Sequence, residues 1–193
     1  MKTVFVDIDT QLDFLYPTGA LYVPGAESIV DNLARLNQHA GAQGIPLIST
    51  MDAHRENDAE FVNWPPHCIL GCLGQRKPSS TVLSEQAIIP YDVEAAVLPM
   101  AKQIIVQKRV LDAFRNPNLP RLLEHLGADR FVVYGVVTEI CVHYAAAGLL
   151  KTGAKVAIVQ DAVKSIDDAA AQAMFAEVRQ QGATLTSVAE VLS

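Results

Sequence analysis

The chain has few charged residues, few cysteines and no long apolar run. Charged residues make up 19% of its 193 residues, and no run of basic residues occurs among them. A formal net charge of −6 excludes the basic surface that binds nucleic acid or an anionic membrane. No apolar stretch approaches the roughly 20 residues of a membrane-spanning helix, and the N-terminus lacks the pattern of a signal peptide. We therefore expect a cytoplasmic protein with no nucleic-acid partner and no membrane association.

Cysteine is too scarce for a disulfide framework. The three cysteines, Cys68, Cys72 and Cys141, are odd in number, so we expect reduced thiols, as in the cytosol. Cys68 and Cys72, with the neighbouring His67, are one candidate set of metal ligands. The pattern is a weak one for structural zinc because no second pair of cysteines follows it. The chain also lacks the P-loop lysine pattern and the G-x-S-x-G turn of serine hydrolases.

Hydrophobic residues, in contrast, make up half of the chain, which excludes a disordered protein and supplies a full core. Short apolar runs alternate with longer segments of helical periodicity. The runs predict strands at 3–8, 45–50, 103–107, 130–136, 155–160 and 184–188, and the periodic segments predict helices at 26–42, 116–127, 138–152 and 165–182. This alternation predicts an α/β fold, a Rossmann-like three-layer α/β/α sandwich with a six-stranded, mostly parallel sheet. We expect a single domain over residues 1–193.

Residues 52–100 interrupt the alternation. They are rich in proline, glycine, histidine and polar residues, and a long irregular segment in a compact domain is usually functional. Asp52 and His54, two positions apart, face the same way from an extended chain. His67 returns through a rigid Pro-Pro turn, and Glu60 lies between them. Mixed carboxylate and imidazole ligands suit zinc, iron or manganese rather than calcium, so we expect a metal-binding insert here.

Three polar side chains close to predicted strand ends are candidates for catalysis. Cys141 falls in the first turn of a predicted helix, where free N–H groups and the helix dipole favour a thiolate and could hold an oxyanion. Asp9 follows the first strand and could act as a general base. Lys108 ends the third strand and could lower the pKa of a thiol. The alternatives are a buried inert cysteine, a turn aspartate and a solvated strand end.

These residues lie in motifs that resemble those of the isochorismatase-like cysteine hydrolases. The run from Asp9 to Phe14 (DTQLDF) resembles the D-x-Q-x-D-F opening of that superfamily. Lys108 precedes a DAF triplet at the family spacing, and the run from Gly135 to Val142 (GVVTEICV) resembles the G-x-x-T-D-x-C-V nucleophile motif, with Glu139 in place of the aspartate. The matches occur in order over nearly the whole chain.

Within the superfamily, the D-x-H and W-P-P-H-C runs of the insert resemble the metal-binding segment of nicotinamidases. The resemblance implies hydrolysis of nicotinamide to nicotinate and ammonia through a cysteine thioester, in NAD salvage. Another small amide, a ureide or a vinyl ether is the alternative substrate, and a non-catalytic binding protein is disfavoured because no triad residue is lost. The resemblance also implies one divalent metal ion, zinc before iron or manganese, and a homo-oligomer.

The same resemblance assigns roles to individual residues and implies a cis peptide bond between Val136 and Val137. The roles are catalytic for Asp9, Lys108 and Cys141, oxyanion binding for the N–H groups of Val137 and Cys141, pyridine-ring contact for Phe14 and Trp64, and metal binding for Asp52, His54, Glu60 and His67.

Overall fold

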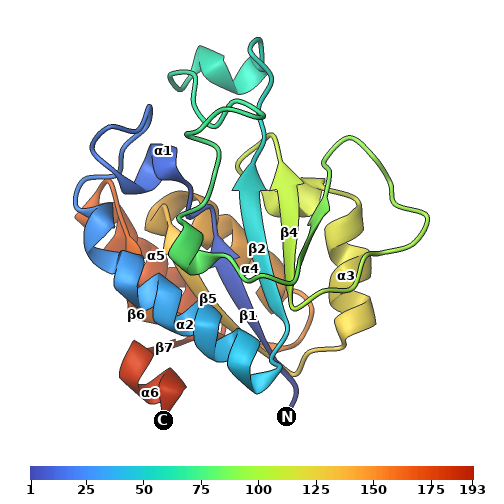
Figure 1. Cartoon of the computed structure of the whole chain (residues 1–193). Helices are drawn as coiled ribbons and strands as arrows, with labels where there is room; N and C mark the ends of the chain where they lie inside the picture. Colours follow the sequence, from blue (N-terminus) through green and yellow to red (C-terminus); the bar gives the residue numbers. More distant parts are fainter.

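A seven-stranded sheet runs through the middle of the computed structural model, which describes residues 1–193 (Figure 1). The strand order is β3-β4-β2-β1-β5-β6-β7, and every neighbouring pair is parallel. The strands are β1 (Thr3–Ile8), β2 (Leu47–Asp52), β3 (Gln86–Ile89), β4 (Gln103–Lys108), β5 (Arg130–Val136), β6 (Lys155–Lys164) and β7 (Thr184–Thr186). The predicted α/β fold is confirmed. The predicted count of six strands is wrong, because the short strand β3 within the irregular segment pairs with β4.

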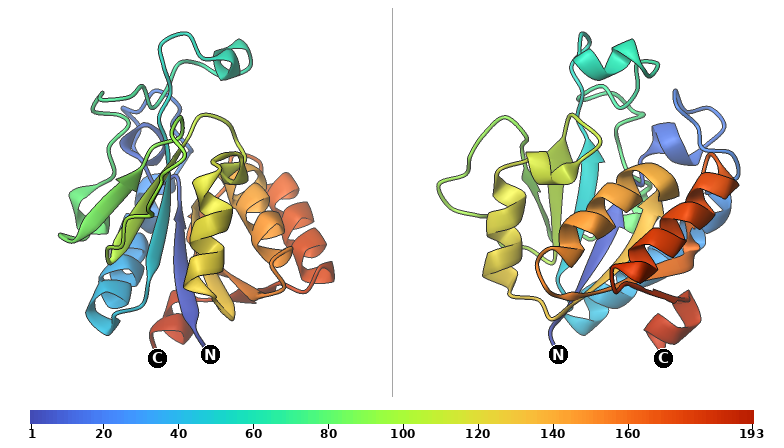
Figure 2. Two further views of the ribbon diagram at one scale, coloured as in Figure 1. Left: turned by 90° about the vertical axis from the view of Figure 1, so that its right-hand side faces the viewer. Right: turned by 180° about the vertical axis from the view of Figure 1, so that it is seen from behind.

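Helices cover both faces of the sheet (Figure 2). Helix α2 lies on one face together with α6, and α3, α4 and α5 lie on the other. The helices are α1 (Leu12–Leu15), α2 (Val30–Gln43), α3 (Asn118–Leu126), α4 (His143–Leu150), α5 (Asp168–Gln180) and α6 (Val188–Leu192). Glycines in the left-handed conformation end α2 at Gly44 and α3 at Gly127, as expected where a helix must stop. None of the helices has the length and apolar composition needed to cross a bilayer.

Several helix boundaries differ from the sequence prediction. The predicted helix at 138–152 begins as a wide turn, Thr138–Val142, before α4 starts. Helix α5 is capped by Asp167, whose carboxylate accepts hydrogen bonds from two backbone N–H groups, and not by Ser165. Helix α6 was not predicted, although Ser187 and Glu190 form a complete capping box at its start.

The irregular segment is anchored to the sheet by a buried ion pair. Lys77, from this segment, places its Nζ 3.2 Å from Asp7 Oδ2 on β1 and 2.9 Å from the hydroxyl of Thr10. All three residues are buried. A buried charge is tolerated only where it is paired and hydrogen-bonded, so this contact fixes one side of the segment above the carboxyl edge of the sheet (Figure 1).

Strands β1 and β5 approach very closely where both end. A Cβ atom at Gly135 would collide with the backbone of Ile8, and Gly135 has a φ of 121°, so glycine is required there. The close approach brings Asp9, just beyond β1, next to the turn that follows β5. The Val136–Val137 peptide bond in that turn is cis, as the family resemblance implies.

Candidate active site and metal centre

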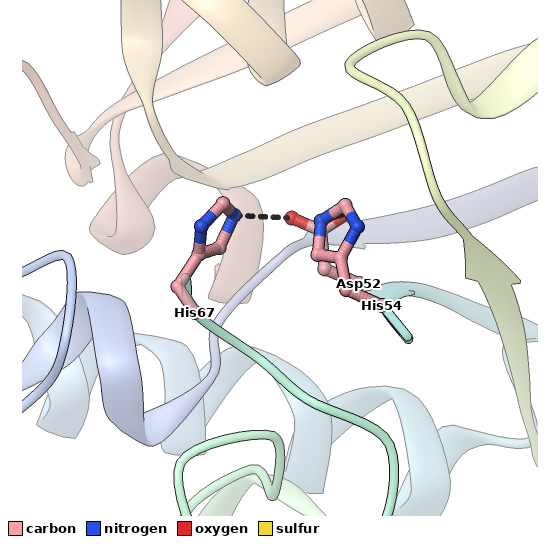
Figure 3. A group of neighbouring side chains, drawn as sticks. All are labelled: Asp52, His54 and His67. Atoms are coloured by element: carbon pink, nitrogen blue, oxygen red, sulfur yellow. Dashed lines mark ion pairs between the residues drawn. The ribbon is translucent and has the colours of Figure 1, made fainter. Parts of the chain in front are cut away.

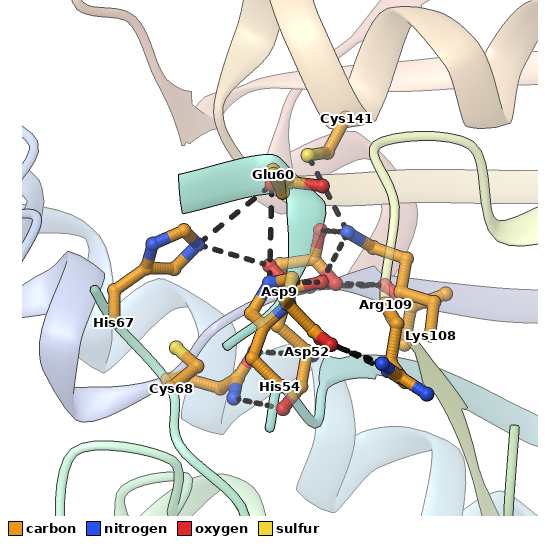
Figure 4. A network of polar contacts seen from close by, with 12 residues as sticks. Asp9, Asp52, His54, Glu60, His67, Cys68, Lys108, Arg109 and Cys141 are labelled. Atoms are coloured by element: carbon orange, nitrogen blue, oxygen red, sulfur yellow. Dashed lines mark hydrogen bonds and ion pairs between the residues drawn. The ribbon is translucent and has the colours of Figure 1, made fainter. Parts of the chain in front are cut away.

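The structure brings Asp9, Lys108 and Cys141 together at the carboxyl edge of the sheet (Figure 4). They follow or end strands β1, β4 and β5, and all three are buried. Lys108 Nζ lies 3.0 Å from Asp9 Oδ2 and 3.7 Å from Cys141 Sγ. A carboxylate and a thiol therefore share one ammonium group, an arrangement that suits proton transfer at the sulfur.

The backbone and one neighbour fix the direction of the Asp9 side chain. Asp9 has a φ of 48°, a left-handed conformation that is uncommon for a residue other than glycine and often marks a functional site. The Thr50 hydroxyl donates to Asp9 Oδ1 at 2.6 Å and accepts from the Asp9 N–H at 3.1 Å. The other carboxylate oxygen faces Lys108 as a result. Sequence reasoning missed Thr50, whose only signal is its position on β2 beside the end of β1.

Burial determines the charge state of the cysteine. Burial raises the pKa of Cys141 well above its ordinary value, the Lys108 charge opposes this shift, and the nearby Asp9 and Asp52 carboxylates add to it. Burial also disfavours the Lys108 ammonium, but the carboxylates of Asp52 and Asp9 hold the pKa of Lys108 well above its usual value. These directions favour the protonated thiol and the lysine ammonium, so removal of the thiol proton by Asp9, as the family resemblance implies, stays a prediction.

The Cys141 N–H lies in the wide turn after β5. The Val137 carbonyl accepts hydrogen bonds from the N–H groups of Ile140 and Val142 and passes over the Cys141 N–H between them. Wide helical turns of this kind occur frequently at functional sites. The Cys141 N–H is therefore not bound to the Val137 carbonyl.

Asp52, His54 and His67 form a second cluster, next to the first (Figure 3). One ligand atom from each residue lies within 4.8 Å of the others, and all three residues are buried. The Nε2 atoms of the two histidines lie 3.9 Å from the Asp52 carboxylate. His54 Nε2 is buried and has no hydrogen-bond partner, which is costly unless a cation or a donor meets it. Two imidazoles and a carboxylate are ligands that suit zinc, so these residues fit a divalent ion.

Glu60 lies beside this trio rather than within it. It comes from a short 3₁₀ turn, Ala59–Val62, and its Oε1 is 3.8 Å from His54 Nε2 and 3.9 Å from His67 Nε2. Burial raises the pKa of Glu60. Its role as a ligand stays a prediction. The alternative set is not assembled here, because Cys68 is buried, Cys72 is exposed, and neither joins the cluster.

Asp52 belongs to both clusters. Its Oδ1 lies 2.5 Å from Lys108 Nζ, and its Oδ2 faces His67 (Figure 4). Asp52 and Lys108 are direct partners in the register of β2 and β4, which places them side by side. The candidate metal ligands and the candidate nucleophile therefore form one continuous polar site.

Two residues of the opening motif hold the first half of the irregular segment in place. The Gln11 amide accepts from Asp52 N–H at 2.7 Å and donates to the carbonyls of Asp52 and Gln75 at 2.9 and 2.8 Å. Asp13 accepts from the Cys68 N–H at 2.7 Å, next to His67. The spacing D-x-Q-x-D gave the family resemblance, but it did not reveal this positioning role.

A small pocket opens onto both clusters. Phe14 and Trp64 lie in its wall, and no lysine or arginine lines it. Contact of these two side chains with a substrate ring stays a prediction. Several apolar wall residues were not predicted, because they come from loops far apart in the sequence. The lining residues are Phe14, Leu21, Asp52, Glu60, Trp64, His67, Leu111, Val136, Val137, Ile140, Cys141 and Ile166. Such a pocket accommodates a small, flat, mainly apolar molecule.

Comparisons with known proteins agree with this geometry. The family model of the isochorismatase domain matches residues 3–190. The chain is 28% identical to the nicotinamidase of Escherichia coli K12 over 95% of this chain and 93% of that protein. It is 23% identical to N-carbamoylsarcosine amidase of Arthrobacter over 84% of this chain, and spans 59% of that longer protein. The crystal structure of a Pyrococcus horikoshii pyrazinamidase in complex with zinc matches with a TM-score of 0.80 and 25% identity, over 97% of this chain and 99% of that one.

Proposed function

This chain belongs to the isochorismatase domain family, and on that premise we propose that it is a metal-dependent amidohydrolase that converts nicotinamide to nicotinate and ammonia. One observation carries the proposal: Cys141 and the trio of Asp52, His54 and His67 line or adjoin the same apolar pocket. A cysteine and a cation site that line or adjoin one pocket suit an aromatic amide, whose flat ring holds the carboxamide and the ring nitrogen at a fixed separation.

In the first half of the reaction Asp9 takes the proton of the Cys141 thiol, and the sulfur attacks the carboxamide carbon. Lys108, 3.7 Å from the sulfur, stabilises the developing thiolate. The N–H groups of Val137 and Cys141 donate to the oxyanion, and one such donor is typically worth about 3 kcal/mol. Asp9 then gives its proton to the leaving nitrogen, the C–N bond breaks, and ammonia departs from a thioester.

In the second half Asp9 takes a proton from water, which attacks the thioester carbon. The C–S bond breaks, nicotinate leaves, and the sulfur recovers its proton. A divalent ion bound by Asp52, His54 and His67 would supply a Lewis acid for the pyridine nitrogen, directly or through water. Phe14 and Trp64 would contact the ring and orient the carboxamide towards Cys141.

The apolar, aromatic wall of the pocket favours nicotinamide over amides that carry a carboxylate. Nine of its twelve lining residues are hydrophobic, Phe14 and Trp64 among them, and no arginine or lysine lines it. Such a wall suits a flat aromatic ring better than the carboxylate of maleamate or N-carbamoylsarcosine. We therefore expect nicotinamide to show the higher kcat/KM.

The test is ammonia release by the purified protein from nicotinamide, maleamate and N-carbamoylsarcosine, with zinc, iron and manganese supplied in turn. Turnover of nicotinamide above the other two amides supports the proposal. If only a carboxylate-bearing amide is turned over, whichever metal is supplied, the substrate is an amide of that class and the cysteine mechanism stays the same.

Replacing His54 with alanine should remove the metal ion and raise KM for nicotinamide sharply. His54 supplies the unpartnered buried Nε2 of the trio, and loss of an interaction made with the bound substrate appears mainly in KM. Metal content by elemental analysis and steady-state kinetics measure the two effects. His125→Ala, an exposed histidine on α3, is the matched control. Full activity of metal-stripped native protein would refute this role of the trio.

A further inference from the structure

The second ring nitrogen of His54 has a partner of its own. Its Nδ1 lies 3.0 Å from Oδ2 of Asp58, four residues along the chain. Both side chains are buried. Asp58 touches neither Cys141 nor the ligand atoms that face the pocket, and neither the motifs nor the cysteine chemistry gives it a role.

Arg109 and the backbone hold Asp58 in place. The guanidinium Nε donates to Asp58 Oδ2 at 2.9 Å, and Nη2 donates to Oδ1, so the contact is two-pronged. The Arg55 N–H donates to Oδ2 at 3.1 Å. These contacts, the Arg109 hydrogen bonds foremost, hold the pKa of Asp58 well below its usual range. A bidentate arginine pair defines the orientation of a carboxylate better than a lysine contact does.

The contacts continue outward to the protein surface. Arg109 Nη1 lies 3.2 Å from Asp92, and Arg55 Nη2 lies 2.6 Å from the same carboxylate. Asp92 and Arg55 are exposed, so their pairing adds little free energy. The inner part of this series of contacts therefore consists of two contacts, Arg109 with Asp58 and Asp58 with His54.

A carboxylate on Nδ1 determines what Nε2 can do. When Nδ1 carries the proton and donates it to Asp58, Nε2 is left with its lone pair facing Asp52 and His67. The ring also loses its freedom to rotate. We propose that Asp58, clamped by Arg109, is a positioning residue that holds His54 in its metal-binding tautomer and strengthens the binding of a divalent ion. This inference rests on the metal site of the proposed function.

The decisive measurement is zinc affinity, by competition with a chromophoric chelator on metal-free protein. Asp58→Ala should weaken zinc binding by about 10- to 100-fold, the usual effect of removing a residue that orients a metal-bound histidine. Asp58→Asn should weaken it less, because the amide oxygen still accepts from Nδ1–H. The absorption spectrum of bound Co²⁺ should also change in Asp58→Ala. Asp31→Asn, an exposed aspartate on α2, should change neither quantity.

A second variant separates positioning from a structural role. If Asp58 served only to neutralise Arg109, the double variant Asp58→Ala/Arg109→Met would recover native zinc affinity. We expect the double variant to stay weak. Recovery there, or native affinity in folded Asp58→Ala, would overturn the inference. If thermal unfolding shows that Asp58→Ala does not fold, the double variant, which leaves no unpaired Arg109 charge, decides the question alone, and native zinc affinity in it overturns the inference.

The affinity experiment does not depend on the substrate. Weakened zinc binding in a protein that ignores nicotinamide would support the positioning role and remove the nicotinamidase proposal. If the protein turns over nicotinamide but Asp58→Ala keeps native zinc affinity, the nicotinamidase proposal is supported and the positioning role of Asp58 is refuted.

Discussion

Replacing Cys141 with alanine is expected to abolish ammonia release while the divalent ion stays bound. The sulfur is the only nucleophile proposed for the site, and it lies beside Lys108 rather than within the trio of ligand atoms. Removing a nucleophile that acts as a unit with its base costs at least about 10⁴-fold in kcat. Ammonia assay at saturating nicotinamide gives the loss, and elemental analysis gives the metal content.

Cys72→Ala is the matched control for this experiment, because Cys72 is an exposed cysteine outside the site. It should keep native turnover. Substantial turnover in Cys141→Ala would show that water, not the sulfur, attacks the amide. Loss of metal from the same variant would show that the two clusters are not separable in the way their geometry indicates.

Replacing Asp9 with asparagine should lower kcat by about 10²- to 10⁴-fold, the usual contribution of a general base. The change is nearly isosteric, and the asparagine oxygen can still accept from the Thr50 hydroxyl. It cannot take the thiol proton. The same substitution removes a negative charge that raises the pKa of Cys141, so that pKa should fall. At a given pH the variant should hold more thiolate and react faster with an alkylating reagent while it turns over more slowly.

These opposite changes distinguish loss of the base from general damage to the site. Thr50→Val is the companion variant: it leaves the carboxylate, removes the hydroxyl that orients it, and should cost less in kcat than Asp9→Asn. Turnover and alkylation rates that fall together in Asp9→Asn would point to a disordered pocket and not to a missing base.

Features set by local sequence were predictable. The buried runs of β1 and β5 are near-continuous apolar stretches, and Gly44 and Gly127 follow the last periodic residues of their helices. The grouping of Asp9, Lys108 and Cys141 as a triad came from the family resemblance, although each was placed at or after a predicted strand end. The cis bond at Val136–Val137 came from the family resemblance alone, since neither residue is proline.

Features that depend on distant partners were not predictable. Strand β3 has only four residues, of which Ile89 alone is buried, and it pairs along the free edge of β4. Asp58 reads as an ordinary loop aspartate until Arg109, 51 positions later, reaches it. The rise in the pKa of Cys141 depends on the fold in the same way, because burial is a property of the folded chain and not of the helix that carries the residue.

The order of strands in the sheet has a consequence for how activity appears during folding. Asp9, Asp52, Lys108 and Cys141 end or follow the strands β1, β2, β4 and β5, which are adjacent in the sheet, and more than 130 positions separate Asp9 from Cys141. Parallel neighbours pair only after long loops have closed, which makes such contacts slow to form. The site therefore does not exist in any hairpin, helix or half of the chain. On refolding, catalysis returns only when the last of these four strands has taken its place.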